Sequence, residues 1–470
     1  MFRSSTISST LLFLGTALLG LTMTKDSDHW AVLVTGSKGF TNYRHSADVC
    51  HAYHIMKNNG IPEEQIILMS YNDAVNAKEN PIPGKLYNKP NGTDVYDGCK
   101  IDYEGDACNS KNFINVLKGN SSGIVGGNGK VLKSNENSKV FVYFVDHGAP
   151  GFIYFPDIEN DKLYGDVINA TLYEMYTTKM YKELVIYMEA CYSGSLFEGI
   201  LPESWNIYVM TAANPHEPSR AAYCHPQDYV GDIHMKTCLG DVFSVSWMEQ
   251  LESVDVKALS LDEQFQIVKN NAIKARSSHV QQYGQIKVVG VQPVSNFVGV
   301  SDLPAPEQSL SFLEQVNFRT FKRTLKTSSI QYPTDEQIQK QFISTISAHD
   351  VHLHHLYTVL QLEGGPKISL DLGSDISDRM RTDHVFKQFN PMLVGVSKRL
   401  TQGDDGPTGT LPRNFDCLRK LVRAYESACG VLREYALKYV HLMVEACENL
   451  PSNDPLGDSF AQQLQNACEH

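Results

Sequence analysis

Five short runs of apolar, β-branched and aromatic residues recur along the first half of the chain and constrain its fold most strongly. Each run is hydrophobic almost without interruption, which is typical of strands buried on both faces, and helical patterns lie between several of them. This alternation predicts an α/β domain with a mostly parallel sheet flanked by helices. The runs are residues 30–36, 66–70, 139–145, 184–190 and 206–212.

Polar segments follow three of these runs, at the ends where parallel strands terminate together. They are residues 36–45 after the first run, residues 146–148 after the third, and residues 189–191 at the end of the fourth. In parallel α/β sheets the functional site lies at the carboxyl ends of the strands. We therefore expect these segments to meet at one edge of the sheet and to form the site.

His147 and Cys191 are the candidate catalytic pair at this edge. A thiolate nucleophile needs a base that generates it and donors that hold the oxyanion of the intermediate. The two residues are 44 positions apart, which brings them together if their strands are neighbours. Alone, either side chain would more often be structural. At matching strand ends, the pair predicts nucleophilic cysteine chemistry.

Length and charge restrict the classes of function. At about 150 residues per domain, a chain of 470 residues predicts two or three domains. The chain carries 41 Lys and Arg against 53 Asp and Glu, a formal net charge of −12, and has no long basic run. It lacks the electrostatic footprint of a nucleic-acid-binding protein, so nucleic acid is excluded as a partner.

The first thirty residues predict entry into the secretory pathway. Arg3 precedes an apolar run over residues 11–21, which is too short to span a bilayer but typical of a signal peptide. We expect removal of residues 1–24, with cleavage near 20–24, and no membrane span afterwards. The route is to a lysosome or vacuole, or out of the cell. Sequons for N-glycosylation lie at Asn91, Asn120 and Asn169.

Ten cysteines on an oxidising route are expected mostly to pair. Cys99 and Cys108, and likewise Cys224 and Cys238, bracket short loops that contain Gly or Pro, so we expect these two pairs. Cys50 lies in a helical-looking stretch, where we expect a small buried hydrophobe.

The residue pattern changes beyond residue 300. Residues 301–309 form a Pro-containing linker, and residues 336–399 and 413–468 have helical periodicity. We therefore expect a separate helical domain after the sheet domain. The expected boundaries are 25–300 for the sheet domain, 301–335 for the linker and 336–470 for the helical domain.

Six motifs in a fixed order resemble the legumain family of asparaginyl endopeptidases and vacuolar processing enzymes. The resemblance runs from about residue 30 to 290 and continues more weakly through the tail, which is similar to the legumain propeptide. It implies a caspase-like fold with a six-stranded sheet, and a cysteine endopeptidase that cleaves after Asn, and after Asp at low pH. The motifs are GSKGFTNYRHSADVCHAY (36–53), PNGTDVY (90–96), DHGAPG (146–151), EACYSG (189–194), TAANP (211–215) and CLGDVFSVSWME (238–249).

The resemblance assigns the catalytic roles. It implies Cys191 as the nucleophile, His147 as the general base and acid, and Asn42 as the residue that orients the imidazole. The backbone N–H groups of Gly148 and Cys191 would form the oxyanion hole. Asp146 is the residue that converts to a succinimide in this family. This chemistry needs no cofactor, and we expect no metal.

The implied specificity has a physical basis. An Asn side chain presents one carbonyl acceptor and an amide donor pair, so its pocket needs a cation opposite carboxylates. Arg44 can donate to the carbonyl oxygen, while Glu189 and Asp241 can accept from the amide. Such a pocket repels ionised Asp but admits protonated Asp, so acid pH should broaden specificity. His45 and Ser219 complete the expected substrate-binding set.

One stretch departs from the family pattern. The family usually continues Asn-Pro with Arg-Glu-Ser-Ser and an aromatic residue, whereas residues 214–220 here read NPHEPSR. Pro218 supplies no hydroxyl, and Arg220 puts a cation near the rim of the pocket. We therefore expect Arg220 to ease the entry of acidic residues.

The resemblance implies that the helical tail is an inhibitory prodomain, which covers the active site until the enzyme cuts the linker at acid pH. Residues 1–300 carry a net charge of −8 and residues 318–399 a net charge of +3. A cationic segment on an acidic domain weakens as carboxylates protonate. The HDVHLHH cluster (349–355) is interpreted as a solvated helix face, ahead of pH sensing and of metal binding.

The remaining expectations concern cleavage, pairing and partners. The expected partners are peptides and proteins with exposed Asn, the prodomain itself, and cystatin-type inhibitors. Asn317 and Asp335 are the two candidates for the activating cut. For the tail we expect the disulfides Cys417–Cys447 and Cys429–Cys468.

Other functions fit the same residues less well. The catalytic subunit of GPI-transamidase has a similar His–Cys core but normally carries a C-terminal membrane span, whereas this tail is amphipathic. A non-catalytic binding homologue would have lost Cys191 or His147, and both are present. An inert secreted scaffold leaves the pocket residues unexplained. Peptide ligation is a side activity open to any acyl-enzyme.

Overall fold

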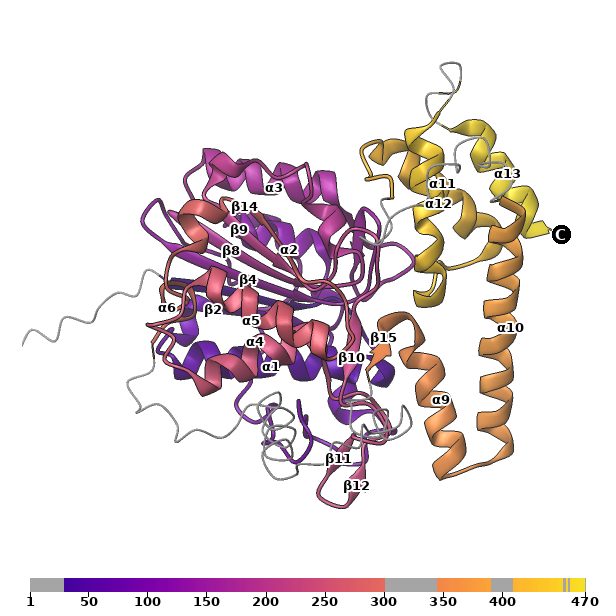
Figure 1. The fold of residues 1–470 in the computed structure, drawn as a ribbon, viewed down its shortest axis with the longest axis horizontal. Coiled ribbons are helices and arrows are strands. Elements are labelled where there is room, and N and C mark those ends of the chain that lie inside the picture. The colour runs from indigo at the N-terminus through magenta and orange to yellow at the C-terminus, as the bar shows by residue number, and fades with distance from the viewer. Residues whose placement is uncertain (1–28, 301–344, 390–408, 451–453, 455–456, 470) are drawn as a thin grey trace, which may run out of the picture.

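The computed structural model describes residues 29–300, 345–389, 409–450, 454 and 457–469. In this part the chain forms a sheet domain and a C-terminal helical domain that packs against it (Figure 1). The expected signal peptide (1–24), the linker (301–335) and both candidate cleavage sites, Asn317 and Asp335, lie outside the described residues.

The central sheet has seven strands, six of them parallel and the edge strand β14 antiparallel. All five apolar runs form strands of this sheet. Two short edge strands, β3 and β14, were not predicted, so the sheet has one strand more than the six expected. Across the sheet the order is β14 (Gln281–Gly284), β9 (Ile207–Thr211), β8 (Glu183–Glu189), β4 (Lys139–Val145), β1 (His29–Thr35), β2 (Ile66–Ser70) and β3 (Tyr103–Glu104).

Helices cover both faces of the sheet, which explains why its strands are hydrophobic without alternation (Figure 1). Ala31 and Leu33 of β1 pack into the core beneath α1, α4 and α5, whereas Val32 and Val34 pack beneath α2 and α3. The helices are α1 (Tyr43–Asn58), α2 (Ser110–Leu117), α3 (Gly165–Thr177), α4 (Val242–Ser253), α5 (Leu261–Lys274) and the short α6 (Ser295–Val298).

Small antiparallel sheets extend the first domain outside the central sheet. One of them includes β15, which comes from the segment that precedes the C-terminal helices. This region was expected to be helical, and the strand is an exception. They are β5 (Gly148–Ala149), β6 (Phe152–Tyr154) and β7 (Lys162–Tyr164); β10 (Arg220–Ala222), β13 (Gly240–Asp241) and β15 (Ile346–Ser347); and the hairpin of β11 (Tyr229–Val230) and β12 (Ile233–His234).

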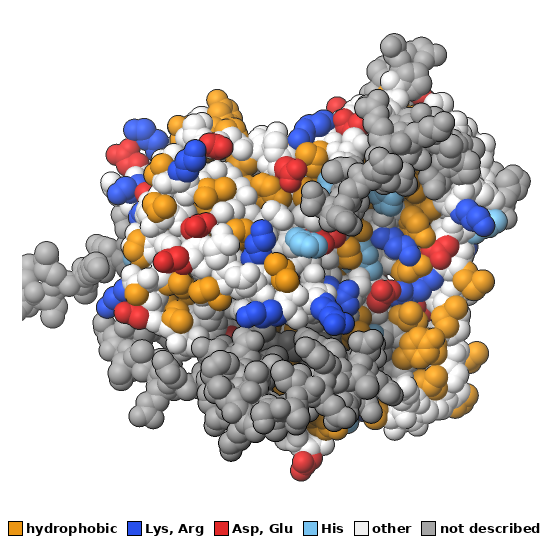
Figure 2. All heavy atoms as spheres, in the orientation of Figure 1, with side chains coloured by type: hydrophobic (Ala, Val, Ile, Leu, Met, Phe, Trp, Pro, Cys, Tyr) orange, Lys and Arg blue, Asp and Glu red, His pale blue; other side chains and the backbone are white. Residues whose placement is uncertain are grey.

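The helical domain shares its core with the sheet domain. Its buried side chains form one cluster with Ala149, Phe152, Tyr154 and Tyr164 of the β5–β7 sheet. Apolar side chains also remain exposed over α9 and α10 (Figure 2), among them Leu370 and Met380 at 74% and 67% exposure. The helices are α9 (Val351–Leu362), α10 (Pro366–Phe389), α11 (Phe415–Cys429), α12 (Val440–Glu448) and α13 (Asp458–Glu469).

None of the helices in the described part of the chain combines the length and the apolar composition needed to cross a membrane.

Three of the four expected disulfides are present, Cys224–Cys238, Cys417–Cys447 and Cys429–Cys468.

The expected pair Cys99–Cys108 is wrong. Cys99 pairs with Cys50 of α1, and Cys108 is a buried free thiol. The reason is the sheet itself, because Cys50 and Cys99 belong to the core on one face and Cys108 to the core on the other. Proximity in sequence therefore gave the wrong partner.

Candidate active site

His147 and Cys191 lie side by side because their strands are neighbours. β4 and β8 pair in parallel with Val145 in register with Glu189, and each candidate residue lies two positions beyond that pair. Gly148 lies directly against the backbone of Cys191. A Cβ at residue 148 would lie 2.4 Å from the carbonyl oxygen of Cys191, so a side chain is excluded there.

Asn42 fixes the orientation of the His147 ring. Its Oδ1 accepts a hydrogen bond from His147 Nε2 at 2.8 Å, while its Nδ2 donates to the carbonyl oxygen of Lys38. Since an amide oxygen only accepts, Nε2 carries the proton. Nδ1 of His147 is buried without a hydrogen-bond partner and is left as the basic nitrogen. Burial lowers the pKa of His147 well below its usual value, and Arg44 adds to this effect.

Cys191 is held as a neutral thiol in this state. It is 1% exposed, and its Sγ lies 3.8 Å from Oγ of Ser219. Burial raises the pKa of the Cys191 thiol to about 12. With the imidazole also neutral, the pair is not poised for attack while the site stays covered.

Three buried charged side chains, Arg44, Glu189 and Asp241, lie together close to Cys191 and form the candidate specificity pocket. Nε of Arg44 donates to Oδ1 of Asp241 at 3.0 Å, and Oε2 of Glu189 accepts from the backbone N–H and the hydroxyl of Ser244. Three further atoms are buried without a hydrogen-bond partner: Nη2 of Arg44, Oε1 of Glu189 and Oδ2 of Asp241. Because buried polar atoms are normally satisfied, these three mark a site for a polar group.

Asp48 supports this pocket and was not singled out from the sequence. It is fully buried one helical turn after Arg44, and its Oδ2 accepts from the backbone N–H of Asp241 at 3.2 Å. Burial and the charge of Asp241 raise its pKa. Burial likewise raises the pKa of Glu189 and of Asp241. An acidic residue four positions after Arg44, among apolar helix residues, was the available signal.

His45 links the pocket to Asp146. Its Nδ1 lies 2.6 Å from Oγ of Ser37 and 3.7 Å from Oδ1 of Asp146, and its Nε2 lies 3.4 Å from Oδ2 of Asp241. Burial raises the pKa of Asp146, which the backbone N–H of His147 partly offsets. His45, Asp146 and His147 could together offer ligand atoms to a metal ion, and a second such group includes Asp228.

An extended segment of the C-terminal region, residues 345–348, covers the nucleophile, and we call it the covering segment. β15 pairs antiparallel with β10, and the backbone N–H of Ala348 donates to the carbonyl oxygen of Ser219 at 3.0 Å. Ala348 packs against Cys191 and Tyr192. Ser219 thus contacts the covering segment through its backbone and Cys191 through its side chain.

The His-rich cluster after this segment was expected to be a solvated helix face, and only part of it is. His349 and His355 are buried, at 4% and 9% exposure, whereas the His352 side chain is 47% exposed. The ring of His349 stacks on Tyr192 with centroids 5.8 Å apart. Helix α9 begins within the cluster, so only part of it faces outward.

Ion pairs cross between the two domains in both directions. Arg419 of α11 binds Asp166, whereas Lys162 of the sheet domain binds Glu426 at 2.8 Å. Oε1 of Glu434 lies 3.8 Å from Nε2 of His147. These tail residues lie outside the segment 318–399 that was expected to be cationic, but within it Glu363 pairs with Lys236 of the sheet domain, so that segment also supplies an anion.

Arg220, expected near the rim of the pocket, binds the covering segment. Its guanidinium donates to the backbone oxygen of Thr345 at 2.8 Å and to its Oγ1 at 3.1 Å. Thr345 lies three residues before Ala348 in the covering segment. In the β10–β15 ladder, Arg220 is in register with Ser347 of the same segment.

Comparisons with known proteins match both domains. The Peptidase C13 family matches residues 29–300, and the legumain prodomain matches residues 371–468. The chain is 34% identical to a vacuolar-processing enzyme of Vicia sativa, over 93% of this chain and 86% of the relative. It is 37% identical to the vacuolar-processing enzyme delta-isozyme of Arabidopsis thaliana, over 89% of this chain and 86% of the relative.

Among solved structures, caspase-1 from Spodoptera frugiperda is a remote neighbour, with a TM-score of 0.34 and 10% identity over 59% of this chain and 92% of that chain.

These matches confirm the predicted family and class of enzyme. The chain is a cysteine endopeptidase whose catalytic domain is followed by an inhibitory helical prodomain. Its α/β domain with a mostly parallel sheet and its C-terminal helices agree with the predicted fold. The chain belongs to the legumain family, Peptidase C13.

Proposed function

We propose that this protein cleaves peptide bonds after Asn, and after Asp at acid pH. The observation that carries the proposal is the set of three unpartnered pocket atoms. A carboxamide complements them, since Nη2 of Arg44 would donate to its carbonyl oxygen while Oε1 of Glu189 and Oδ2 of Asp241 accept from its NH₂. A glutamine carries the same group one methylene further out.

The proposed mechanism uses the neutral pair described above. When substrate replaces the covering segment, Nδ1 of His147 takes the proton of Cys191, and Sγ attacks the scissile carbonyl carbon. The N–H groups of Gly148 and Cys191 donate to the oxyanion. His147 then protonates the leaving amine, and a water activated by the same ring hydrolyses the thioester. Asn42 keeps the ring oriented throughout.

An amine that reaches the thioester before water would be ligated, so we include ligation as a side activity. Asp146 is the proposed site of a succinimide, in which the backbone nitrogen of His147 would close onto the side-chain carbonyl carbon with loss of water. The buried, uncharged setting of the Asp146 carboxyl supports this role.

The proposed regulation is self-activation in an acidic compartment of the secretory pathway, a vacuole or a lysosome. The covering segment supports an uncleaved zymogen. Ala348 lies against Cys191, but it has no carboxamide and is too short to fill the proposed pocket. The activating cut would fall at Asn317 or Asp335. Glycosylation is proposed at the exposed residues Asn91 and Asn120, and at the half-buried Asn169.

A series of peptides that differ only in the residue before the cut tests the specificity. After acid activation we expect cleavage of Ala-Ala-Asn at all working pH values, of Ala-Ala-Asp only at acid pH, and of Ala-Ala-Gln at neither. The Cys191→Ala protein, treated identically, is the control. Equal cleavage of the Asn and Gln peptides would contradict the proposed pocket, while leaving the cysteine protease intact.

A further inference from the structure

The loop closed by the Cys224–Cys238 disulfide holds three side chains with metal-binding atoms at one point. One ligand atom each from His225, Asp228 and His234 lies within 4.8 Å of the others. Nδ1 of His225 and Nδ1 of His234 lie 3.3 and 3.0 Å from the same oxygen, Oδ1 of Asp228. Metal bonds of about 2.0–2.1 Å in a tetrahedron would put ligand atoms roughly 3.3 Å apart, which the two distances to Oδ1 already approach.

Asp228 is oriented as a ligating carboxylate would be. It is fully buried, and its Oδ2 accepts the backbone N–H of Lys236 at 2.6 Å. This bond turns Oδ1 toward the two imidazoles, which is the role that outer hydrogen bonds play around metal ligands. The disulfide fixes the base of the loop, and its cysteines are 14 positions apart in the sequence.

The His225 nitrogen is not accounted for by the protein alone. Nδ1 of His225 is buried and, although it lies 3.3 Å from the Asp228 oxygen, it makes no hydrogen bond. The distance suits a hydrogen bond and the direction does not. A cation between the ring and the carboxylate would give this nitrogen a partner and would replace the hydrogen bond between Nδ1 of His234 and Oδ1 of Asp228.

We propose that His225, Asp228 and His234 bind a divalent transition-metal ion, for which Zn²⁺ is the probe. Two imidazoles and one carboxylate are a common zinc donor set that leaves one coordination position open. Calcium and magnesium prefer oxygen ligands and fit this set poorly. The site is separate from the group that contains His147 in the active site.

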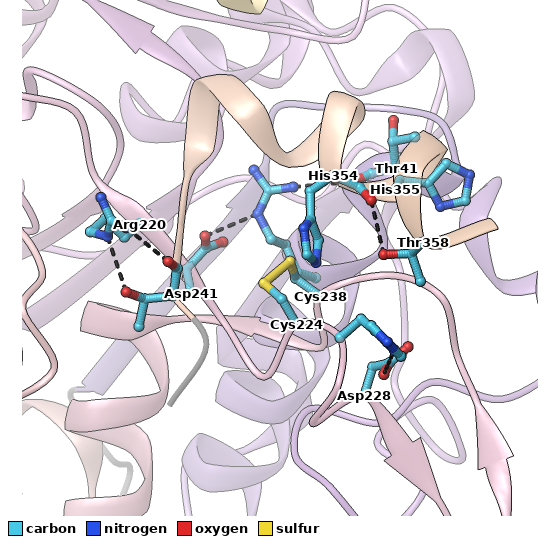
Figure 3. Close-up of a disulfide and its surroundings, with 12 residues drawn as sticks. Thr41, Arg220, Cys224, Asp228, Cys238, Asp241, His354, His355 and Thr358 are labelled. Carbon is cyan, nitrogen blue, oxygen red and sulfur yellow. Dashed lines mark hydrogen bonds and ion pairs between the residues drawn. A yellow bond between two sulfur atoms is a disulfide. The ribbon is translucent and has the colours of Figure 1, made fainter. Parts of the chain in front are cut away.

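The prodomain docks on this loop. His354 of α9 lies over the disulfide (Figure 3), and Nδ1 of His355 lies 2.7 Å from the carbonyl oxygen of Lys236. Lys236 also forms an ion pair with Glu363 at the end of α9. Nε2 of His354 is buried without a hydrogen-bond partner. A metal in the loop would thus be bound beneath the helix that follows the covering segment.

The full-length Cys191→Ala protein is the material for the test, because it lacks the catalytic thiol as a competing ligand. Zn²⁺ is titrated against a chromophoric competitor. We expect one loop site whose affinity falls at least about tenfold in His225→Asn and in His234→Asn. His279→Asn is the matched control, since this exposed histidine pairs with Glu217 away from the loop, and its affinity should be unchanged.

Two further readouts keep the outcome decisive. Far-UV circular dichroism and the Tm in EDTA identify any variant that fails to fold. If His225→Asn or His234→Asn does not fold, the zinc affinity of the other variant decides the outcome. Zn²⁺ should raise the Tm of the Cys191→Ala protein but not that of the loop variants. The proposal fails if Zn²⁺ does not bind, or if both folded loop variants bind it with unchanged affinity. It also fails if only His45→Asn, in the active-site group, loses zinc binding.

Discussion

The proposed specificity of the active site rests on single buried atoms that have no hydrogen-bond partner inside the protein. Arg44 was expected to donate and Glu189 and Asp241 to accept, and the unpartnered atom on each has the matching polarity. Sequence reasoning could find these residues through the motifs that contain them. Asp48 lies in the first of these motifs as well, but it was not singled out, because its role depends on being fully buried beside Asp241.

Glu189→Gln tests the pocket directly. Burial raises the pKa of Glu189, so this group becomes neutral as pH falls and then repels an acidic substrate less. At pH 6.5 the variant should therefore cleave the Asp and Asn peptides in the ratio that the wild type shows at acid pH. Hydrogen bonds to charged groups contribute about 1.5–3 kcal/mol, so kcat/KM for the Asn peptide should fall about tenfold to hundredfold. Exposed Glu203→Gln is the control, and an unchanged Asp-to-Asn ratio would count against the pocket.

Arg220→Tyr tests a second specificity contact. Ala348 lies at the nucleophile, so Thr345 marks the fourth residue before a cut, and Arg220 binds it. The freed guanidinium should favour Asp or Glu at that position by about twofold to fivefold, as expected for a partly exposed ion pair. A peptide library should show this preference lost in the variant. If the Asn-to-Asp ratio changes instead, the original expectation of a pocket-rim contact would be right.

At the level of elements, the sequence predicted those strands whose burial is complete on both faces. β1, β4 and β8 are continuous apolar runs because helices cover both sides of the sheet. β14 is the polar run QQYG and β3 is only two residues long, so neither carries a hydrophobic signal. β15 forms only because β10 offers it a partner, which no local pattern records.

His349, directly after the covering segment, forms a pH-sensitive contact with the catalytic domain. Burial lowers its pKa to about 3, whereas a released histidine titrates near 6.5. Between these values the released form binds a proton that the covered form excludes, so release becomes easier as pH falls below about 6.5, by up to about 1.4 kcal/mol per pH unit. The charged or titratable groups that act on it are His147, Asp350, Lys438 and Glu434.

His349→Phe should keep the stacking on Tyr192 and lose the proton. At pH 5 the variant should release the prodomain about thirtyfold less readily than the wild type, which corresponds to about 2 kcal/mol. The measurement is the pH midpoint of activation, and it should move to lower pH. The matched control is His352→Phe, whose wild-type side chain is 47% exposed. An identical midpoint for His349→Phe would remove His349 from the release mechanism.

For the whole molecule, the resting state is a closed assembly of two domains with one shared core. Arg419 of α11 binds Asp166 and lies over the ring of Tyr164, far along the chain from the covering segment. Arg419→Ala should weaken docking by about 1 kcal/mol or less, because the pair is partly exposed, and so speed activation severalfold. Exposed Arg423→Ala on the same helix is the control. Equal rates for both variants would mean that this interface does not hold the prodomain.

The most direct test combines intact mass with activity. The full-length protein and its Cys191→Ala variant are held at pH 4.5, and the cleavage of Ala-Ala-Asn is followed beside the mass of the chain. We expect activity to appear as the C-terminal mass is lost, only in the wild type, with a product that ends at Asn317 or Asp335. A folded wild-type chain that stays silent on Asn at every pH, even after limited proteolysis removes the prodomain, would contradict the assignment.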